Sequence, residues 1–465
     1  MAKNKKVLII GLDCATPELI FDRLLDQLPN TKSLMERGMY GKLESCIPPI
    51  TVPAWTCMMT SKNPGKLGFY GFRNRSDYSY GGLSFATGNL VKEDAVWDIL
   101  SHLGKQVVMI GIPQTYPPKP VNGYMITCFL TPDTKSQYTY PPDFRNEVEN
   151  VVGDYMLDVD EFRTEDKDLL LKEIYKMTEK RFKVAKHLIK TKEWDFFMMV
   201  EMGVDRIYHG FWKYCDPLHK KYEPNNRYEH SIPEYHKYLD QQIGEIVALI
   251  DDRTVVMIVS DHGAQRMEGG ICVNEWLIRE GYLTLLEKPE GVVPLGKAKI
   301  DWRHTVAWGE GGYYSRIFLN VKGREPQGVI EREKYHQVRE ELKEKLEALK
   351  DEQGKNIGTR VLRPEDVYPV RNGIPPDLIV YFGNLRWRSV GSIGLNTVHT
   401  FENDTGPDDA NHAENGIFIL YDPTDQSTRR SSPVSGLSIY DIAPTVLHRL
   451  GVNVPSDMEG KIITS

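Results

Sequence analysis

The amino-acid sequence predicts a doubly wound α/β protein, in which helices cover both faces of a mainly parallel β-sheet. The first observation is a series of short apolar runs bounded by turn residues, which are typical of buried parallel strands. They lie at 7–10, 107–112, 196–200, 254–259, 317–321, 378–382 and 417–420. The second observation is that helical patterns lie between several of these runs, at 16–28, 94–103, 166–190, 233–250 and 331–349. Layered α/β folds are built from this alternation of strand and helix.

Three long stretches without a clear pattern interrupt the alternation, at 62–92, 113–165 and 265–315. Long loops in compact domains commonly form lids or binding elements. The sequence shows neither an internal repeat nor a boundary between two independent domains. We therefore expect a single domain over residues 1–465, with residues 265–315 forming a small cap inserted within it.

Composition argues against several classes of protein. A net charge of −7 and a pI of about 6.0 do not suit a nucleic-acid-binding protein, which carries a basic surface. The apolar run at 7–10 is too short for a signal peptide, and no segment reaches the roughly 18 apolar residues of a membrane span. The six cysteines show no CxxC spacing, as expected of buried thiols in a reducing compartment. We therefore expect a soluble cytoplasmic protein without a membrane or nucleic-acid partner.

Two predicted strands end in candidate metal ligands. Asp13 follows the run at 7–10, and Asp261 and His262 follow the run at 254–259. Ligands of α/β proteins bind beyond the carboxyl ends of parallel strands, and carboxylate and imidazole groups bind Zn²⁺ or Mn²⁺. Each motif alone also fits a structural role, as a helix cap at Asp13 or as a strand-ending turn at 261–263.

Three further polar residues lie close to predicted strands. Asp205 and His209 are four residues apart, a spacing that puts both side chains on one face of a helix. His412 lies just before the run at 417–420. Taken separately, the first two fit an ordinary surface pair, and a lone histidine is usually structural.

Thr51 is the candidate nucleophile. Pro49 and Pro53 restrict the backbone on both sides of its hydroxyl group, although a threonine here also fits a simple helix cap. Considered together, these candidates favour a functional site more strongly than any one of them does alone. Three acids, three histidines and one hydroxyl group supply the six ligands and the bridging nucleophile that two metal ions about 4 Å apart require.

In this order, these residues resemble the motifs of the alkaline phosphatase superfamily, and most closely those of its type I phosphodiesterase/nucleotide pyrophosphatase branch. The segment 51–68 is similar to the nucleophile helix of that family and the turn after it, and the segment 439–450 resembles its closing helix. The resemblance implies an alkaline-phosphatase-like three-layer α/β/α sandwich with inserted loops or a cap, forming one catalytic domain.

The resemblance also implies the chemistry. Two divalent ions, Zn²⁺ or Mn²⁺, would be the cofactors, and Thr51 would contact them and form a phosphothreonine intermediate. Asp13, Asp261 and His262 would hold one ion, and Asp205, His209 and His412 would hold the other. The expected activity is that of a phosphodiesterase or nucleotide pyrophosphatase on a small phosphorylated substrate such as a nucleotide.

The sequence departs from the family pattern after the nucleophile. Ser61 and Leu67 replace a glycine and a histidine of the family's turn, and the family's phosphate-binding asparagine falls near Phe72. Four residues nearby are candidates for phosphate contact, with solvated loop charges as the alternative: Lys62, Lys66, Arg73 and Asn74. A sulfatase is disfavoured because Cys46-Ile-Pro48 lacks the arginine of the sulfatase maturation signal.

Two alternatives remain open. The first is a phosphomonoesterase, or a phosphotransferase resembling cofactor-independent phosphoglycerate mutase. That mutase usually has a serine nucleophile and a large inserted domain, so Thr51 weighs against it. The second is a non-catalytic, metal-stabilised binding protein, which the intact ligand positions disfavour.

Overall fold

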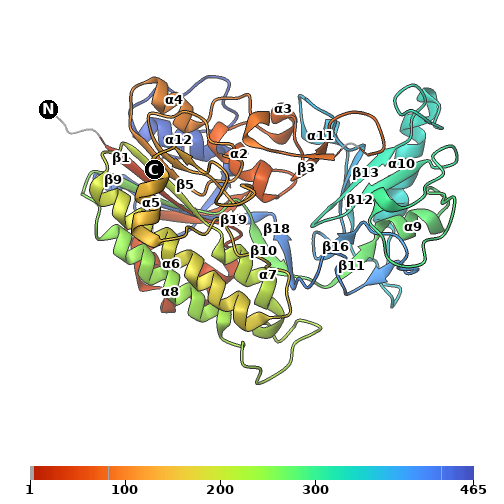
Figure 1. Ribbon diagram of the computed structural model, residues 1–465, viewed down its shortest axis with the longest axis horizontal. Coiled ribbons are helices and arrows are strands. Elements are labelled where there is room, and N and C mark those ends of the chain that lie inside the picture. Colours follow the sequence, from red (N-terminus) through yellow and green to blue (C-terminus); the bar gives the residue numbers. More distant parts are fainter. Residues whose placement is uncertain (1–4, 82, 431, 465) are drawn as a thin grey trace. The chain divides into compact units, whose positions relative to one another are not determined.

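The chain divides into two compact units, which are described separately below (Figure 1). The computed structural model describes residues 5–81, 83–430 and 432–464. The first unit comprises Met1–Asn63, Ala86–Ala264 and Ala413–Ser465, and the second comprises Pro64–Phe85 and Gln265–His412. The stretch 265–315, expected to form a small cap, lies within the second unit, which continues to His412.

The first unit is built on a nine-stranded, mainly parallel sheet, which confirms the predicted fold class. The strands in spatial order are β20 (Val434–Ser438), β2 (Met39–Glu44), β19 (Asn415–Tyr421), β9 (Thr254–Val259), β1 (Lys6–Leu12), β8 (Phe196–Glu201), β5 (Val107–Ile110), β6 (Gly123–Ile126) and β7 (Thr139–Tyr140). The central strands β9, β1, β8, β5 and β6 are mutually parallel. β19 runs antiparallel to both of its neighbours, and β7 runs antiparallel to β6.

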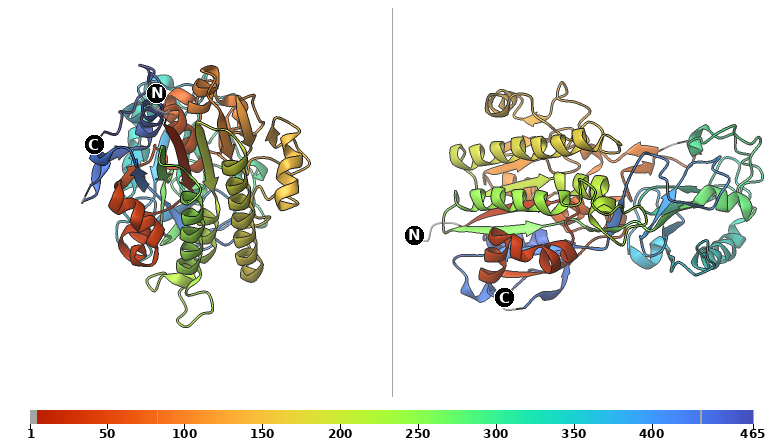
Figure 2. Two further views of the ribbon diagram at one scale, coloured as in Figure 1. Left: turned by 90° about the vertical axis from the view of Figure 1, so that its left-hand side faces the viewer. Right: turned by 90° about the horizontal axis from the view of Figure 1, so that it is seen from below.

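Helices cover both faces of this sheet, as Figures 1 and 2 show for the first unit. On one face, α2 (Thr51–Thr60), α4 (Val96–His102) and α12 (Ile442–Arg449) pack together and against β1 and β5. On the other face lie α1 (Pro29–Arg37), α6 (Lys167–Thr191), α7 (Gly203–Cys215) and α8 (Ser231–Val247), while α5 (Phe144–Val152) packs on α6 and β7. The strands between these layers are almost fully apolar and buried, as expected of a sheet covered on both faces.

The second unit contains mainly small antiparallel sheets. Its largest sheet has the order β12 (Ala307–Glu310), β13 (Ser315–Leu319), β15 (Leu378–Tyr381), β14 (Arg360–Leu362). A second has the order β16 (Trp387–Val390), β11 (Gly269–Cys272), β17 (His399–Thr400), and β3 (Arg73–Arg75) pairs with β4 (Leu83–Phe85). Its helices are α3 (Pro64–Leu67), α9 (Val273–Arg279), α10 (Tyr335–Glu347) and α11 (Pro364–Val367). The strands β10 (Gly263–Arg266) and β18 (Ala410–Ala413) form a further two-stranded sheet.

Two expectations from the sequence need correction. The runs at 317–321 and 378–382 form β13 and β15 of the second unit, and not strands of the central sheet. An apolar run shows that a strand is buried but not which sheet it joins. The pattern at 16–28 forms a π-helical turn, Glu18–Arg23, and a short 3₁₀ segment, Leu25–Gln27, before Pro29 begins α1. Proline is favoured at the first position of a helix, so a new helix begins there.

Short 3₁₀ segments occupy several connections in both units: Gly88–Leu90, Leu295–Lys297, Arg332–Lys334, Gln426–Thr428 and Ile439–Asp441. Among the described residues, no helix has both the length and the apolar character that crossing a membrane demands. No disulfide joins any of the six cysteines in this part of the chain, and five of them are buried.

A buried histidine lies between two helices of the first unit. The Nε2 atom of His236 on α8 lies 2.8 Å from the hydroxyl oxygen of Tyr208 on α7. Burial lowers the pKa of His236 from 6.5 to about 3, because a charged imidazole loses its hydration inside the protein. His236 is therefore neutral in the folded protein at neutral pH.

We expect His236 to make the protein sensitive to acid. The unfolded chain binds a proton at His236 near pH 6.5 and the folded protein only near pH 3, so this source of stability is complete above pH 6.5 and is lost as pH falls. Between pH 7 and pH 5, the wild-type protein should lose about 2 kcal/mol more unfolding free energy than His236→Gln, which binds no proton. Urea denaturation at both pH values measures this difference. Equal losses in the two proteins would contradict a neutral buried His236.

Candidate active site

Neighbouring parallel strands bring the first candidate residues to one edge of the sheet. β1 lies between β8 and β9, and Gly11 is level with both Val200 and Val259. Asp13 lies two residues beyond Gly11, and Asp261 lies two residues beyond Val259. Both carboxylates therefore leave the sheet together, at the edge where parallel sheets bind ligands.

Trp55 fixes one oxygen of Asp13. The indole Nε1 of Trp55 donates a hydrogen bond of 2.7 Å to Asp13 Oδ2, and the backbone N–H of Asp13 donates to Glu201 O at 3.0 Å. A Cβ atom on Gly11 would lie 2.5 Å from the Trp55 ring, so glycine leaves the room that the ring needs. The other oxygen, Asp13 Oδ1, is buried and accepts no hydrogen bond from any residue that the structure describes.

Thr51 is the first residue of α2, and its hydroxyl group faces His262. The distance between Thr51 Oγ1 and His262 Nε2 is 3.1 Å. Ile50 before it has extended backbone, and Pro53 lies in the first turn, where its missing N–H costs no helical hydrogen bond. All ten residues of α2 are buried, so the Thr51 hydroxyl is held in a rigid environment.

The backbone orients the His262 ring. Its Nδ1 lies 3.1 Å from Gly263 O, and because a carbonyl oxygen only accepts, Nδ1 carries the proton. Nε2 therefore presents its lone pair to Thr51 Oγ1, to Asp261 Oδ2 at 3.1 Å and to Asp13 Oδ1 at 3.9 Å. Burial lowers the pKa of His262 to about 4, so this ring is neutral at neutral pH.

These three groups fit a divalent cation. Burial raises the pKa of both carboxyl groups well above the usual range. The negative charge of Asp205 raises the pKa of Asp13 further, and the negative charge of Asp13 raises that of Asp261. A cation would satisfy both carboxylates and the imidazole lone pair together. The possible ligand atoms of Asp13, Asp261 and His262 lie within 4.8 Å of one another, close enough to share one ion.

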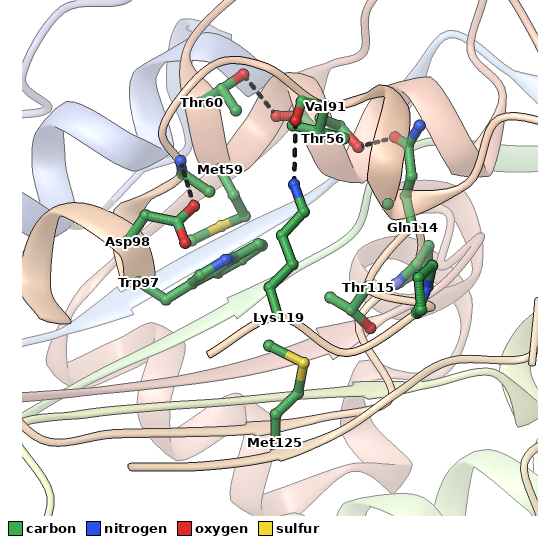
Figure 3. Close-up of a pocket in the computed structure, with 14 residues that line it drawn as sticks. Thr56, Met59, Thr60, Val91, Trp97, Asp98, Gln114, Thr115, Lys119 and Met125 are labelled. Carbon is green, nitrogen blue, oxygen red and sulfur yellow. Dashed lines mark hydrogen bonds between the residues drawn. The ribbon is translucent and has the colours of Figure 1, made fainter. Parts of the chain in front are cut away.

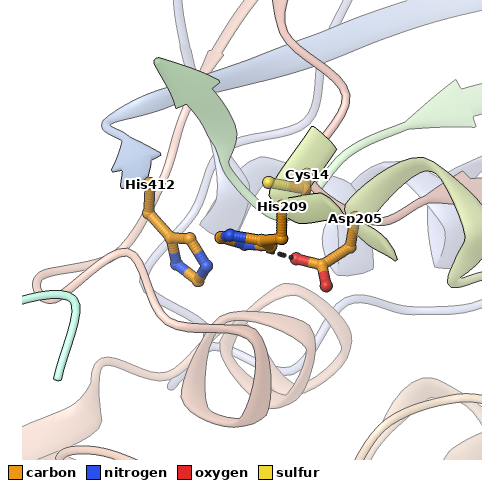
Figure 4. Close-up of side chains that lie close together, drawn as sticks. All are labelled: Cys14, Asp205, His209 and His412. Atoms are coloured by element: carbon orange, nitrogen blue, oxygen red, sulfur yellow. Dashed lines mark ion pairs between the residues drawn. The ribbon is translucent and has the colours of Figure 1, made fainter. Parts of the chain in front are cut away.

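A second group of possible ligands lies on and beside α7. Asp205 and His209 are one helical turn apart, and His209 Nε2 lies 3.2 Å from Asp205 Oδ1 (Figure 4). The possible ligand atoms of these two residues and the sulfur of Cys14 also lie within 4.8 Å of one another. Arg206 pairs with Asp205 and is held in turn by Asp158 at 2.6 and 2.9 Å. Asp205 and His209 are therefore not an ordinary surface pair, because both side chains are buried and Asp205 also pairs with Arg206.

His412, also drawn in Figure 4, is the last residue of the second unit. It lies on β18, is buried, and stacks on Tyr313 with 3.8 Å between ring centroids. Its backbone oxygen accepts a hydrogen bond of 2.9 Å from the side chain of Gln265. The first unit resumes with the next residue, Ala413.

Two of the candidates for phosphate contact have structural partners. Lys62 has an exposed side-chain fraction of only 3%, and its Nζ lies 2.6 Å from Asp457 Oδ2. Asn74 closes a turn, because its side chain accepts from Tyr70 N at 2.6 Å and donates to Gly71 O at 2.8 Å. Neither side chain is held ready for a phosphate by these contacts.

The other two phosphate candidates are more accessible and belong to the second unit. Arg73 is exposed and lies over the ring of Phe85, 4.5 Å from its centroid. Lys66 is half-buried on α3. Phosphate contact by any of the four residues stays a prediction.

A small cavity of about 30 Å³ lies along α2 (Figure 3). Thr56, Met59 and Thr60 line it on the helix, and Trp97 and Gln114 are among the other lining residues. None of the predicted ligands, nor Thr51, lines this cavity. Its volume suits about one water molecule, so it is too small to hold a phosphorylated substrate.

Comparison with known proteins decides the family. The profile of the type I phosphodiesterase / nucleotide pyrophosphatase family matches residues 7–408. The chain belongs to this family. It is therefore a phosphoester hydrolase by family, as the order of its motifs predicted. His412 lies just beyond the matched residues, and no curated protein matches the sequence.

Solved structures share the fold of this phosphodiesterase-family protein. Phosphonoacetate hydrolase from Sinorhizobium meliloti 1021, in complex with phosphonoformate, has a TM-score of 0.62 at 13% identity, over 97% of this chain and 96% of that one. Human ectonucleotide pyrophosphatase / phosphodiesterase 5 has a TM-score of 0.56 at 13% identity, over 98% and 97%. An inactive form of the murine enzyme in complex with AMP has a TM-score of 0.55 at 11% identity, over 97% and 96%. At these identities the likeness shows the fold alone.

The sequence did not single out three side chains at this site of the phosphodiesterase-family protein. Trp55 binds Asp13, Arg206 binds Asp205, and Cys14 lies beside His209. Arg206 and Cys14 each follow a predicted ligand directly in the chain. Their position next to a predicted ligand was the signal that the sequence offered. The side chains of consecutive residues usually point in different directions, so this position did not predict that they contact the site.

Proposed function

We propose that the protein is a metal-dependent phosphodiesterase that acts through a phosphothreonine intermediate on Thr51. One observation carries the proposal: the Thr51 hydroxyl lies 3.1 Å from His262 Nε2, whose lone pair also faces Asp13 and Asp261. A hydroxyl group at the edge of a cation site is positioned for activation as a nucleophile.

The proposed ligand sets follow the two groups of residues. Asp13, Asp261 and His262 hold one divalent ion, and Asp205, His209 and His412 hold the other. Oxygen and nitrogen ligands of this kind suit Zn²⁺ or Mn²⁺. Bound ions supply positive charge that lowers the pKa of the Thr51 hydroxyl and stabilises the leaving oxygen.

Chain connectivity within the first unit supports the role of His412. Two residues after it, Glu414 O accepts a hydrogen bond of 2.8 Å from Ser45 N, and the Ser45 hydroxyl donates to Asp261 O at 2.6 Å. Because successive Cα atoms are 3.8 Å apart, His412 is tethered within about 8 Å of Glu414. His412 can therefore serve the edge of the sheet that carries Asp261.

The protein residues then have defined tasks. The Thr51 oxygen attacks phosphorus, the bond from phosphorus to the leaving alcohol breaks, and water later hydrolyses the phosphothreonine and restores the hydroxyl group. Trp55 holds Asp13 in orientation, and Arg206 does the same for Asp205. These positioning contacts keep the carboxylates fixed through both steps.

The proposed substrate is a small phosphodiester, such as a nucleotide derivative, and the proposed compartment is the cytoplasm. Family membership supports the diester. The ligands bound in similar structures, AMP and phosphonoformate, are small phosphorus compounds, the first a phosphomonoester and the second a phosphonate. Thiols without disulfides suit a reducing compartment.

A paired assay tests this function. Protein stripped with a chelator and reloaded with Zn²⁺ or Mn²⁺ should cleave bis-p-nitrophenyl phosphate at least about tenfold faster than p-nitrophenyl phosphate. The stripped protein should cleave neither, and elemental analysis should find two ions in the active protein. Faster cleavage of the monoester would favour a phosphomonoesterase. Full binding of two ions without any turnover would favour a metal-stabilised binding protein.

A further inference from the structure

Cys14 lies between the two proposed metal sites, and the mechanism above gives it no task. Its backbone φ is 68°, a left-handed conformation that favours glycine over any residue with a side chain. Its backbone N–H donates to Asp261 Oδ1 at 3.2 Å, so the residue contacts the first group of ligands. Local backbone preference therefore does not explain a cysteine at this position, and residues in such strained conformations often lie at functional sites.

The side chain of Cys14 belongs to the second group of ligands. Its sulfur lies within 4.8 Å of the possible ligand atoms of Asp205 and His209 (Figure 4). Asp13 Oδ1, on the preceding residue, is buried and accepts no hydrogen bond from the described residues. The thiol donates a long hydrogen bond of 3.5 Å to Gly263 O, which is weak, as sulfur donors are, and it also hydrogen-bonds the side chain of His209. The thiol therefore lies in a buried group of oxygen and nitrogen ligands that is built for a cation.

We propose that Cys14 is a further ligand of the second metal ion, which it binds as a thiolate; this rests on the proposed two-metal function. The sulfur–hydrogen bond breaks, its proton passes to solvent, and the sulfur lone pair forms the bond to the ion.

Cys14 consequently determines which metal the protein prefers. Thiolate ligands favour Zn²⁺, whereas Mn²⁺ favours carboxylate and other oxygen ligands. Glycine would adopt the left-handed backbone at this position without strain, whereas a cysteine there destabilises the fold but places a sulfur atom beside the second group of ligands.

The test compares Cys14→Gly with a matched cysteine variant after both are loaded with Co²⁺. Glycine suits the backbone at this position, so Cys14→Gly should fold as well as the wild-type protein. Cys128→Ala is the control, because Cys128 is also a buried cysteine of the first unit and lies outside both ligand groups. The wild-type protein and the control should show a near-ultraviolet thiolate-to-cobalt absorption band that Cys14→Gly lacks. In competition, the preference for Zn²⁺ over Mn²⁺ should fall at least about tenfold in Cys14→Gly only.

Two results would overturn the Cys14 proposal: two bound cobalt ions without the band in the wild-type protein, or a band that persists in Cys14→Gly. The first leaves the two-metal function intact, since only the sulfur ligand is then missing. Conversely, a band that depends on Cys14 in a protein without phosphodiesterase activity would support the sulfur ligand and overturn the proposed function. The two proposals therefore fail independently.

Discussion

Thr51→Ala should lower the turnover of a phosphodiester by at least about 10⁴-fold, because it removes the attacking oxygen. The fold should tolerate the change. The N-cap residue of α2 is Ile50 and has no side-chain cap, so the variant loses the contact of 3.1 Å with His262 and one buried methyl group. We expect the unfolding free energy to fall by less than about 2.5 kcal/mol. Turnover assays, urea denaturation and elemental analysis of the same sample, which should still hold two ions, check these expectations.

Two other threonine variants provide the controls for this prediction. Thr51→Ser keeps a hydroxyl group and should retain measurable turnover. Thr60→Ala removes a buried hydroxyl from the same helix, where it donates to Thr56 O at 2.7 Å, and should leave turnover within about threefold of the wild-type value. Wild-type activity in Thr51→Ala would show that another group attacks phosphorus.

Asp261→Asn should stabilise the metal-free protein and inactivate the metal-loaded one. In the metal-free state, burial and the charge of Asp13 raise the pKa of Asp261 well above 3.8. A raised carboxyl pKa means that stability is lost as pH rises from the unfolded value through the folded one. Asparagine removes the buried charge and can still accept the hydrogen bond from Cys14 N.

Asp261→Asn should raise the stability of the metal-free protein but lower its metal binding and turnover. At pH 8, the metal-free variant should be about 1–3 kcal/mol more stable than the metal-free wild-type protein, since a buried unpaired charge is costly. The variant should also bind one ion fewer, and its turnover should fall at least about 10³-fold. Denaturation curves with and without metal, together with elemental analysis, measure both effects.

Asp240→Asn is the matched control for that experiment. Asp240 is also a buried carboxylate, but it accepts hydrogen bonds from Asn30 and Thr31 at 2.7–3.0 Å. Its replacement should destabilise the protein with or without metal and leave metal content unchanged. If metal-free Asp261→Asn is destabilised as Asp240→Asn is, then the buried Asp261 carboxylate does not destabilise the metal-free protein, and the prediction is wrong.

Sequence patterns predicted those parts of the fold that depend on short-range periodicity. The run at 254–259 coincides with β9, and the helical pattern at 166–190 differs from α6 by one residue at each end. Strands and long helices of this kind are specified by the alternation or spacing of apolar residues within the segment itself. By contrast, α1 (Pro29–Arg37) was not expected, because its apolar pattern is short and weak.

Pairing between distant segments could not be predicted in the same way. The runs that form β13 and β15 look like those of the central sheet but lie in another unit. The second unit also draws Pro64–Phe85 and Gln265–His412 together from separate parts of the chain. Sheet membership depends on long-range contacts, which no local pattern records.

For the candidate site, the sequence by itself determined which possible ligand types are present, their order along the chain, and the family to which they point. Only the tertiary structure decided that Asp13, Asp261 and His262 share one buried space, that Trp55 holds Asp13, and that the sulfur of Cys14 lies beside Asp205 and His209. The physical reason is that strand ends and helix turns fix a residue's position locally. The direction in which its side chain points, and what it meets there, depend on how distant segments pack.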